Sequence, residues 1–159
     1  MSFIDEIKAR AKKEIKTIIL PEAEDKRVLE AASKVTKEGF AKVILLGDAT
    51  KIKEDCKSNE IDLDGVDIIN PLTSEKKEEY KQKLYELRKN KGMTPEQAEV
   101  LLKEPIYFGM MMLKDENSNA DGLVSGAAHS TANTLRPALQ ILKTKPGTKL
   151  VSAFFVMCV

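Results

Sequence analysis

The residues best suited to chemistry lie between Asp121 and Gln140, in the segment DGLVSGAAHSTANTLRPALQ. A short apolar run there leads into small residues and then into a helical pattern, so the segment predicts a buried strand, a loop and a helix. Backbone N–H groups of such a loop point into one space at the start of the helix, where they suit an anion such as phosphate. The candidate anion-binding residues of this loop are Ser125, Gly126, Ser130 and Thr131.

One arginine, Arg136, falls early in the expected helix after this loop. A guanidinium group there can add a forked pair of donors to an oxyanion, so Arg136 is the main candidate for clamping it. A purely structural interpretation also holds, because strand, small-residue loop and helix form the ordinary corner of a parallel α/β unit, and Ser or Thr before a helix is common capping. On the pattern alone, that structural interpretation is the better one.

The single histidine of the chain, His129, lies in the same loop. No second residue in the sequence marks it as half of a catalytic pair, so we expect it to pack or to form a hydrogen bond rather than to act as a base.

Strand and helix patterns alternate through the first half of the chain. Expected strands at residues 17–20, 42–46 and 66–69 are separated by an expected helix at 25–38, ended by Gly39, and by a second helix capped by Asp48. Two βαβ units in succession predict a mainly parallel sheet with right-handed crossovers. The expected fold class is therefore α/β, a three-layer α/β/α arrangement.

The remaining segments are mostly helical in pattern. A capping-box sequence at Thr94, Pro95 and Gln97 predicts a helix over residues 95–103. Apolar spacing predicts further helices at 4–11 and from about Ser74 to residue 88, and a strand at 122–124. Residues 106–113 fit a strand or a helix by periodicity, and we favour a helix because 122–124 supplies the next strand. The run from Leu150 to Val159 is β-branched and aromatic, which is typical of a buried parallel strand that needs cover on both faces.

Composition excludes several classes of protein. The 159 residues have a net charge of +1, with 32% charged and 42% hydrophobic residues, which is typical of a soluble globular protein. Basic residues alternate with acidic ones, so we expect no nucleic-acid partner. No stretch is apolar enough for a membrane span or a signal peptide, so a cytoplasmic location is expected. Cys56 and Cys158 lack metal-ligand spacing, and we expect reduced thiols and no metal.

The amino-acid sequence of the anion loop and its helix, GLVSGAAHSTANTLRPALQIL, resembles the corresponding stretch of the phosphate acetyltransferases (phosphotransacetylases) and their butyryl-transferring relatives. TIILPEAEDKRVLEAA, LYELRKNKGMTPEQA and PIYFGMMMLK resemble other parts of that family in the same order. The resemblance covers nearly the whole chain. It implies that residues 1–159 are the amino-terminal α/β portion of a two-domain acyltransferase with an isocitrate/isopropylmalate dehydrogenase-like fold, and that the carboxy-terminal half is absent.

The activity that the resemblance implies is reversible acetyl transfer between acetyl-CoA and phosphate. Coenzyme A would be a substrate, no metal or prosthetic group would be needed, and the whole enzyme would be a homodimer. Arg136 would position phosphate, and Arg88, in its LRK context, would contact coenzyme A, although Arg88 also suits a cation that complements a helix dipole. The family's thiol-activating aspartate and its serine–arginine pair belong to the other half, so the chain alone is expected to bind ligands weakly and not to turn them over.

Two alternatives remain beside this expectation. Phosphate butyryltransferases share the anion loop, and the acyl pocket is expected to involve the other half. Phosphotransacetylase-like domains are also appended to malic enzymes, where they bind acetyl-CoA. Such a domain follows a dehydrogenase, so a start at Met1 favours the free enzyme.

Overall fold

A parallel sheet organises the part of the chain that the computed structural model describes, residues 2–153 and 156–157. Within these residues, strands β1 (Lys16–Leu20), β2 (Ala41–Leu46), β3 (Asp67–Ile69) and β4 (Gly122–Leu123) form one sheet in the order β3-β2-β1-β4. All three neighbouring pairs run parallel, with Ile18 opposite Val43 on one side and opposite Gly122 on the other. The expected parallel sheet is confirmed.

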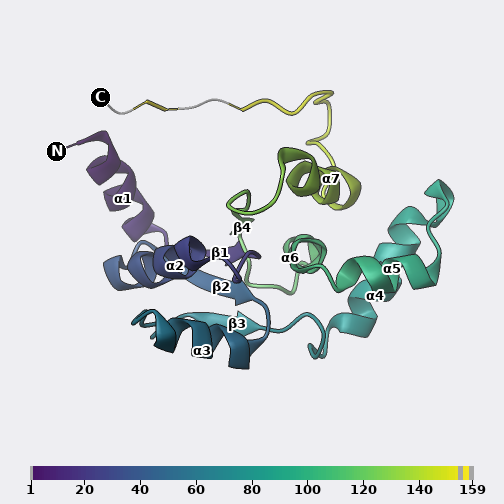
Figure 1. Ribbon diagram of the computed structural model, residues 1–159. Coiled ribbons are helices and arrows are strands. Elements are labelled where there is room, and N and C mark those ends of the chain that lie inside the picture. The colour runs from purple at the N-terminus through teal and green to yellow at the C-terminus, as the bar shows by residue number, and fades with distance from the viewer. Residues whose placement is uncertain (1, 154–155, 158–159) are drawn as a thin grey trace.

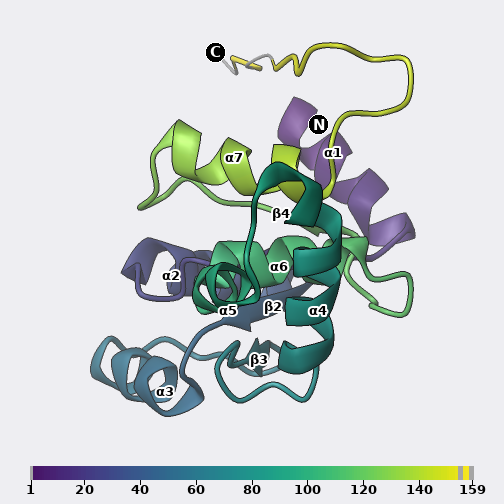
Figure 2. The ribbon, with the colours of Figure 1, turned by 90° about the vertical axis from the view of Figure 1, so that its right-hand side faces the viewer.

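Helices cover both faces of this sheet (Figure 1). On one face α2 (Lys26–Glu38) and α3 (Ala49–Ser58) bury Val43 and Leu45 in a shared core. On the other face α6 (Pro105–Lys114) buries Ile44 and Leu46, with α4 (Lys77–Arg88) and α5 (Pro95–Leu102) packed outside it, as Figure 2 also shows. Successive strand residues point to opposite faces, so one apolar run serves both cores. The expected three-layer α/β/α arrangement is confirmed.

Helix α6 approaches the sheet closely at Gly109. A Cβ atom at this position would lie 2.7 Å from Leu123 Cδ1 and 3.1 Å from Leu46 Cδ1, both inside normal contact distance. The absence of a side chain at Gly109 lets the helix backbone lie directly over β4 and β2. Because α6 carries Tyr107, this close approach also fixes one wall of the candidate site described below.

The helix ends follow the local signals in the sequence. Asp25 and Asp48 accept hydrogen bonds from amides in the first turns of α2 and α3, and Gly39 ends α2 with φ 68°. Thr94 and Gln97 form the expected capping box of α5. Each of these contacts joins residues within three positions of one another, so the sequence alone predicts them well.

Helix α4 begins later than expected, at Lys77 rather than near Ser74. The Ser74 hydroxyl accepts a hydrogen bond from the Lys76 amide at 3.3 Å, and the Lys77 amide donates to the Ser74 carbonyl at 3.1 Å. A local turn at residues 74–76 therefore replaces the first helical turn.

The strand expected at Leu150–Val159 is wrong for the residues that the structure describes. Residues 150–153 and 156–157 belong to no strand, and Leu150 and Met157 are 80% and 82% exposed. The chain leaves α7 (Thr131–Ile141) as an extended segment away from the sheet (Figure 1). No described strand pairs with this segment, and a parallel strand needs such a neighbour to satisfy its amides. The other four residues of the run, including Cys158, lie outside the described residues.

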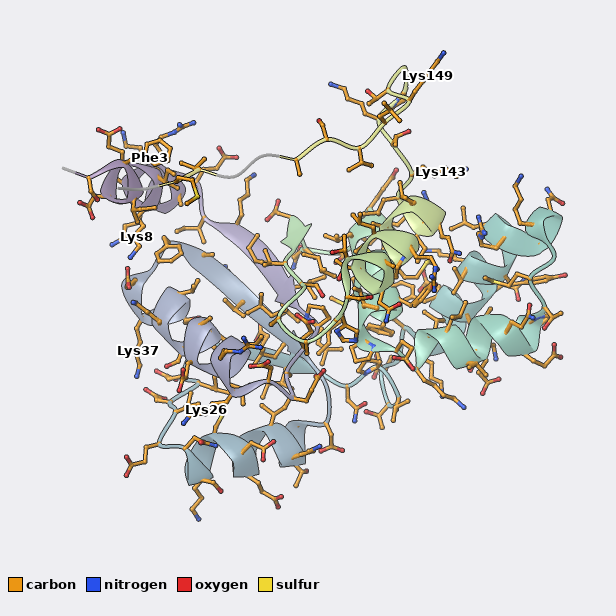
Figure 3. The ribbon with its side chains drawn as sticks, turned by 45° about the horizontal axis from the view of Figure 1, so that its top comes forward. Phe3, Lys8, Lys26, Lys37, Lys143 and Lys149 are labelled. Atoms are coloured by element: carbon orange, nitrogen blue, oxygen red, sulfur yellow. The ribbon has the colours of Figure 1, made fainter. Side chains whose placement is uncertain are left out.

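Helix α1 (Phe3–Lys13) confirms the expected amphipathic helix but stands apart from both cores. Its apolar residues Phe3, Ile4 and Ile7 are about half exposed, at 51%, 45% and 45%. Lys8 extends from α1 toward the end of α2, where its ammonium pairs with Glu38 and lies 5.4 Å from the centre of the Phe40 ring (Figure 3). This polar contact helps to hold α1 against α2.

Candidate functional site

The candidate site lies where the strand order of the sheet changes direction. From β1 the chain crosses by α2 to β2 on one side, whereas β4 pairs with β1 on the other side. The carboxyl ends of β1 and β4 are therefore adjacent, and the loops that follow them diverge. Ligands of open α/β sheets bind in the crevice outside such a switch point.

A buried carboxylate, Glu22, occupies the space between these two strand ends. Its Oε2 accepts hydrogen bonds from the amides of Gly126 and Ala127, both at 2.9 Å. Its Oε1 accepts from the amides of Ala128 at 2.9 Å and His129 at 2.8 Å, and His129 Nδ1 lies 2.7 Å from the same oxygen. Glu22 is 1% exposed, so the loop after β4 encloses it almost completely.

The hydrogen bonds decide the charge of Glu22. Burial opposes its charged form, but the donors from Ala128, Ala127 and His129 together outweigh burial and lower the pKa of the carboxyl group to about 2. Glu22 is therefore an ionised acceptor at neutral pH.

The anion that the loop holds is thus part of the protein. The sequence led us to expect the loop amides to bind a ligand phosphate, but the four amides of residues 126–129 already donate to Glu22. Sequence reasoning did not single out Glu22. The available signal is its position in LPEAED, directly after a buried strand and Pro21, at the sheet edge where ligands and loops meet.

A second side chain, Arg27 of α2, also holds the loop. Its Nη2 donates to the carbonyl of Ala127 at 2.7 Å and to Asp25 Oδ2 at 2.6 Å. The same loop therefore contacts an anion through its amides and a cation through a carbonyl. Both contacts come from the segment after β1, so the two strand ends form one unit.

The predicted loop residues do not converge on a single point. Ser130 caps α7, its Oγ accepting from the Asn133 amide at 3.2 Å, and Thr131 is the exposed first residue of that helix. Ser125 Oγ is buried without a hydrogen-bond partner among the described residues, and Ser125 borders a hollow on the α2 side, beside Arg27. Gly126, with φ 115°, gives the turn that points its amide at Glu22.

Arg136 lines a different cavity, of about 210 Å³, between the start of α6 and α7. The polar residues of this cavity are Glu104, Tyr107, His129, Asn133 and Arg136, and its apolar residues are Leu101, Ile106 and Pro137. The Tyr107 hydroxyl donates to Gln140 Oε1 at 3.0 Å and so ties α7 to α6. The structure brings Arg136 beside His129 and places Ser125 against the separate hollow.

Arg88 approaches the same tyrosine from α4. It is the last residue of that helix, before the short 3-10 turn η1 (Lys89–Lys91), and its Nε is buried without a partner among the described residues. Burial raises the pKa of the Tyr107 hydroxyl, and the positive charges of Arg136 and Arg88 act in the opposite direction. Two guanidinium groups far apart in sequence thus both lie close enough to act on one hydroxyl.

A larger cavity of about 570 Å³ lies between α4 and the end of α6. It contains Lys83 and Asp115 but none of the residues that the sequence suggested for ligands. Asp115 is buried and accepts a hydrogen bond from the Tyr80 hydroxyl at 3.0 Å, with Lys76 and Lys83 each within 4 Å. These contacts already satisfy the carboxylate, so we interpret this cluster as a structural tie between α4 and the turn after α6.

Other kinds of site have no support in the described part of the chain. Over residues 2–153 and 156–157, the His, Cys, Asp and Glu side chains nowhere gather in a way that could hold a metal ion. The helices of this part are also too short or too polar to cross a membrane. Cys56 is a buried thiol of the α2–α3 core, as expected of a structural cysteine.

Residues 2–159 match the family described as phosphate acetyl/butaryl transferase. The chain belongs to the phosphate acetyl/butyryl transferase family. Two curated members are the phosphate acetyltransferases of Acetivibrio thermocellus, 58% identical over 159 residues, and of Clostridium acetobutylicum, 50% identical over 159 residues.

Solved structures of the family share the fold. The EutD phosphotransacetylase from Staphylococcus aureus superposes with a TM-score of 0.82 at 45% identity, over 92% of this chain and 44% of that one. A phosphotransacetylase from Streptococcus pyogenes gives 0.83 at 36% identity, over 94% of this chain and 46% of that one. The chain covers 47% of the length of each of the two curated relatives, so it corresponds to a little under half of a family member.

Proposed function

We propose that the protein is part of a phosphate acetyltransferase, which moves an acetyl group between coenzyme A and inorganic phosphate. The observation that carries the proposal is the cavity between α6 and α7 that Arg136 lines, with Arg88 acting on the hydroxyl of Tyr107, another residue of its lining. The reaction brings together two anionic substrates, and paired guanidinium groups suit phosphate oxygens. The names of the similar curated proteins support the same assignment.

In the proposed reaction an oxygen of phosphate attacks the acetyl carbonyl of the thioester, and the thiolate of coenzyme A leaves. The described residues can contribute binding and orientation, since Arg136 can hold the phosphate and Arg88 can hold an anionic group of coenzyme A. Holding both reactants in one orientation lowers the barrier without a change in their covalent chemistry. Coenzyme A acts here as a substrate, and the proposal includes no metal or prosthetic group.

Acetyl transfer is favoured over butyryl transfer because the relatives at 50–58% identity are named for acetyl transfer. An acetyl-CoA-binding module of the kind appended to malic enzymes is not favoured for the same reason. A homodimer and a cytoplasmic location stay predictions, which sedimentation and cell fractionation would test.

The test is a chimeric enzyme in which this chain replaces the matching segment of the Acetivibrio thermocellus relative, with which it shares 58% identity. Release of coenzyme A from acetyl-CoA is measured with phosphate varied, and butyryl-CoA serves as the competing substrate. We expect saturable, phosphate-dependent release with acetyl-CoA preferred. A folded chimera that releases no coenzyme A would overturn the proposal. A preference for butyryl-CoA would show that the transferred group is butyryl and not acetyl.

A further inference from the structure

The bond between Glu22 and His129 determines which nitrogen of the imidazole ring can meet a ligand. An ionised carboxylate only accepts hydrogen bonds, so Nδ1, 2.7 Å from Glu22 Oε1, must carry the hydrogen. In a singly protonated ring the lone pair is then on Nε2. Because His129 lines the cavity of Arg136, Nε2 is the ring nitrogen left for a ligand there.

Helix α7 supplies a second acceptor to the same cavity. Pro137 lies inside the helix and has no N–H group, so the carbonyl of Asn133, four residues earlier, lacks its usual helical donor. Asn133 and Pro137 both line the cavity, as does the carboxylate of Glu104. Beside the donors of Arg136, the lining of the cavity therefore includes hydrogen-bond acceptors that can receive a donor from a ligand.

We propose that this cavity recognises the hydrogen phosphate ion by its single P–OH group, which donates to Nε2 of His129 while Arg136 binds the unprotonated oxygens. This inference rests on the proposed function and adds to it the protonation state of the phosphate and the residue that selects it. Only hydrogen bonds form in this step. Glu22 is a positioning residue, because it fixes the ring hydrogen on Nδ1 and holds the loop that carries His129.

A lone pair at Nε2 also excludes competing anions. Sulfate has nearly the shape and charge of hydrogen phosphate but carries no proton near neutral pH, so it would place a lone pair against a lone pair. Sites that offer a partner to one polar hydrogen reject analogues that lack it more strongly than sites that select by size. The dianion of acetyl phosphate likewise has no P–OH group, so His129 should distinguish the two phosphate-containing reactants.

The chain has one histidine, so its ring nitrogens can be observed without overlap from another imidazole. Long-range proton–nitrogen NMR spectra of the 159-residue chain at about pH 8, where imidazoles usually carry one proton, should show the hydrogen on Nδ1. Inorganic phosphate should shift Nε2, and sulfate at equal ionic strength should not. A hydrogen on Nε2, an equal response to both anions, or no response to phosphate would each overturn the proposal.

Two substitutions separate the ligand contact from the Glu22 contact. The side-chain amide of His129→Asn can replace Nδ1 and keep the bond to Glu22, but it leaves nothing at the place of Nε2. His129→Gln reaches the place of Nε2 and abandons Glu22. The affinities for phosphate and for sulfate are measured from shifts in backbone amide spectra. We expect the parent to prefer phosphate about tenfold, the effect of one hydrogen bond to a charged group, and the Asn variant to lose this preference. The Gln variant should keep part of it, and an Asn variant with unchanged preference would refute the assignment.

The chimeric enzyme distinguishes failure of this inference from failure of the proposed function. His129→Asn should raise the KM for phosphate about tenfold and the KM for acetyl phosphate much less. Equal effects on both substrates, with transfer otherwise normal, would refute the role of His129 alone. If the chimera transfers no acetyl group while His129 Nε2 of the 159-residue chain still responds to phosphate, the proposed function is refuted and the phosphate site remains supported.

Discussion

Glu22 Oε1 and His129 Nδ1 lie 2.7 Å apart although 107 positions separate the two residues in the sequence. The contact exists because β1 and β4 are neighbours in the sheet, so the residues that follow each strand meet at the same edge. Through this contact one carboxylate organises four backbone amides, a histidine ring and the entry to α7.

The stability of the chain should depend strongly on Glu22. Glu22→Gln keeps the size of the side chain but replaces one acceptor oxygen by a donor, which leaves one pair of the part-buried amides of residues 126–129 without its acceptor. We expect a loss of about 3 kcal/mol in the free energy of unfolding, measured in urea, since each orphaned buried donor costs about 1–3 kcal/mol. Glu24→Gln, at an exposed neighbouring position, is the control and should change little. Equal stability of the two variants would contradict the buried role of Glu22.

The same residue should make stability depend on pH in acid. The folded-state pKa of Glu22, about 2, is below the ordinary value of 4.5, so its contribution is present above about pH 4.5 and is lost as the pH falls toward 2. A depression of this size corresponds to about 3 kcal/mol. Other carboxylates with lowered pKa values, such as those of Asp25 and Asp115, add to the acid sensitivity. The measurement is therefore the difference in the free energy of unfolding between the parent and Glu22→Gln. This difference should shrink as the pH falls from about 4.5 to 2. A difference that stays constant over this range would show that the carboxylate is not ionised in the folded protein.

Arg136 should bind phosphate through its forked donors. In the chimeric enzyme, Arg136→Ala should lower kcat/KM for phosphate by about 10- to 100-fold, because a hydrogen bond to a charged group contributes about 1.5–3 kcal/mol. Arg136→Lys should recover little, since an ammonium group cannot reproduce the fork. The matched control is Lys143→Ala, which removes an exposed cation just beyond the end of α7 (Figure 3). Parental activity in Arg136→Ala would show that the arginine is not a ligand.

Arg88 has two interpretations that kinetics can separate. If it contacts coenzyme A, Arg88→Ala should raise the KM for coenzyme A well above any change for acetyl phosphate, with kcat less affected. If it only complements the dipole of α4, the substitution should cost about 0.3–1 kcal/mol of stability and leave the kinetics unchanged. We expect the first result, because Arg88 Nε is buried and the positive charge of Arg88 acts on the Tyr107 hydroxyl. Lys91→Ala, in the exposed turn that follows, serves as the control.

The sequence by itself determined most of the elements and the starts of α2, α3 and α5. Alternating apolar runs predicted the parallel strands, and Asp25, Asp48 and Thr94 predicted the starts of their helices. These features depend on residues within a few positions of each other, so local hydrogen bonding and side-chain period are enough to specify them. The amino-acid sequence of the loop and of α7 also indicates the family to which the chain belongs.

The tertiary structure alone decided how the polar groups of the loop are used. The amides of the loop suit an anion, as its sequence predicts. Whether that anion is a ligand or Glu22 depends on which strand ends lie side by side in the sheet. The order of the strands is set by packing across the whole sheet. The same holds for Arg88, which α4 carries toward Tyr107, and for the run from Leu150, which finds no partner strand among the described residues. A hydrogen-bond donor is recognisable from its residue type, but its partner is specified only when distant segments are brought into contact.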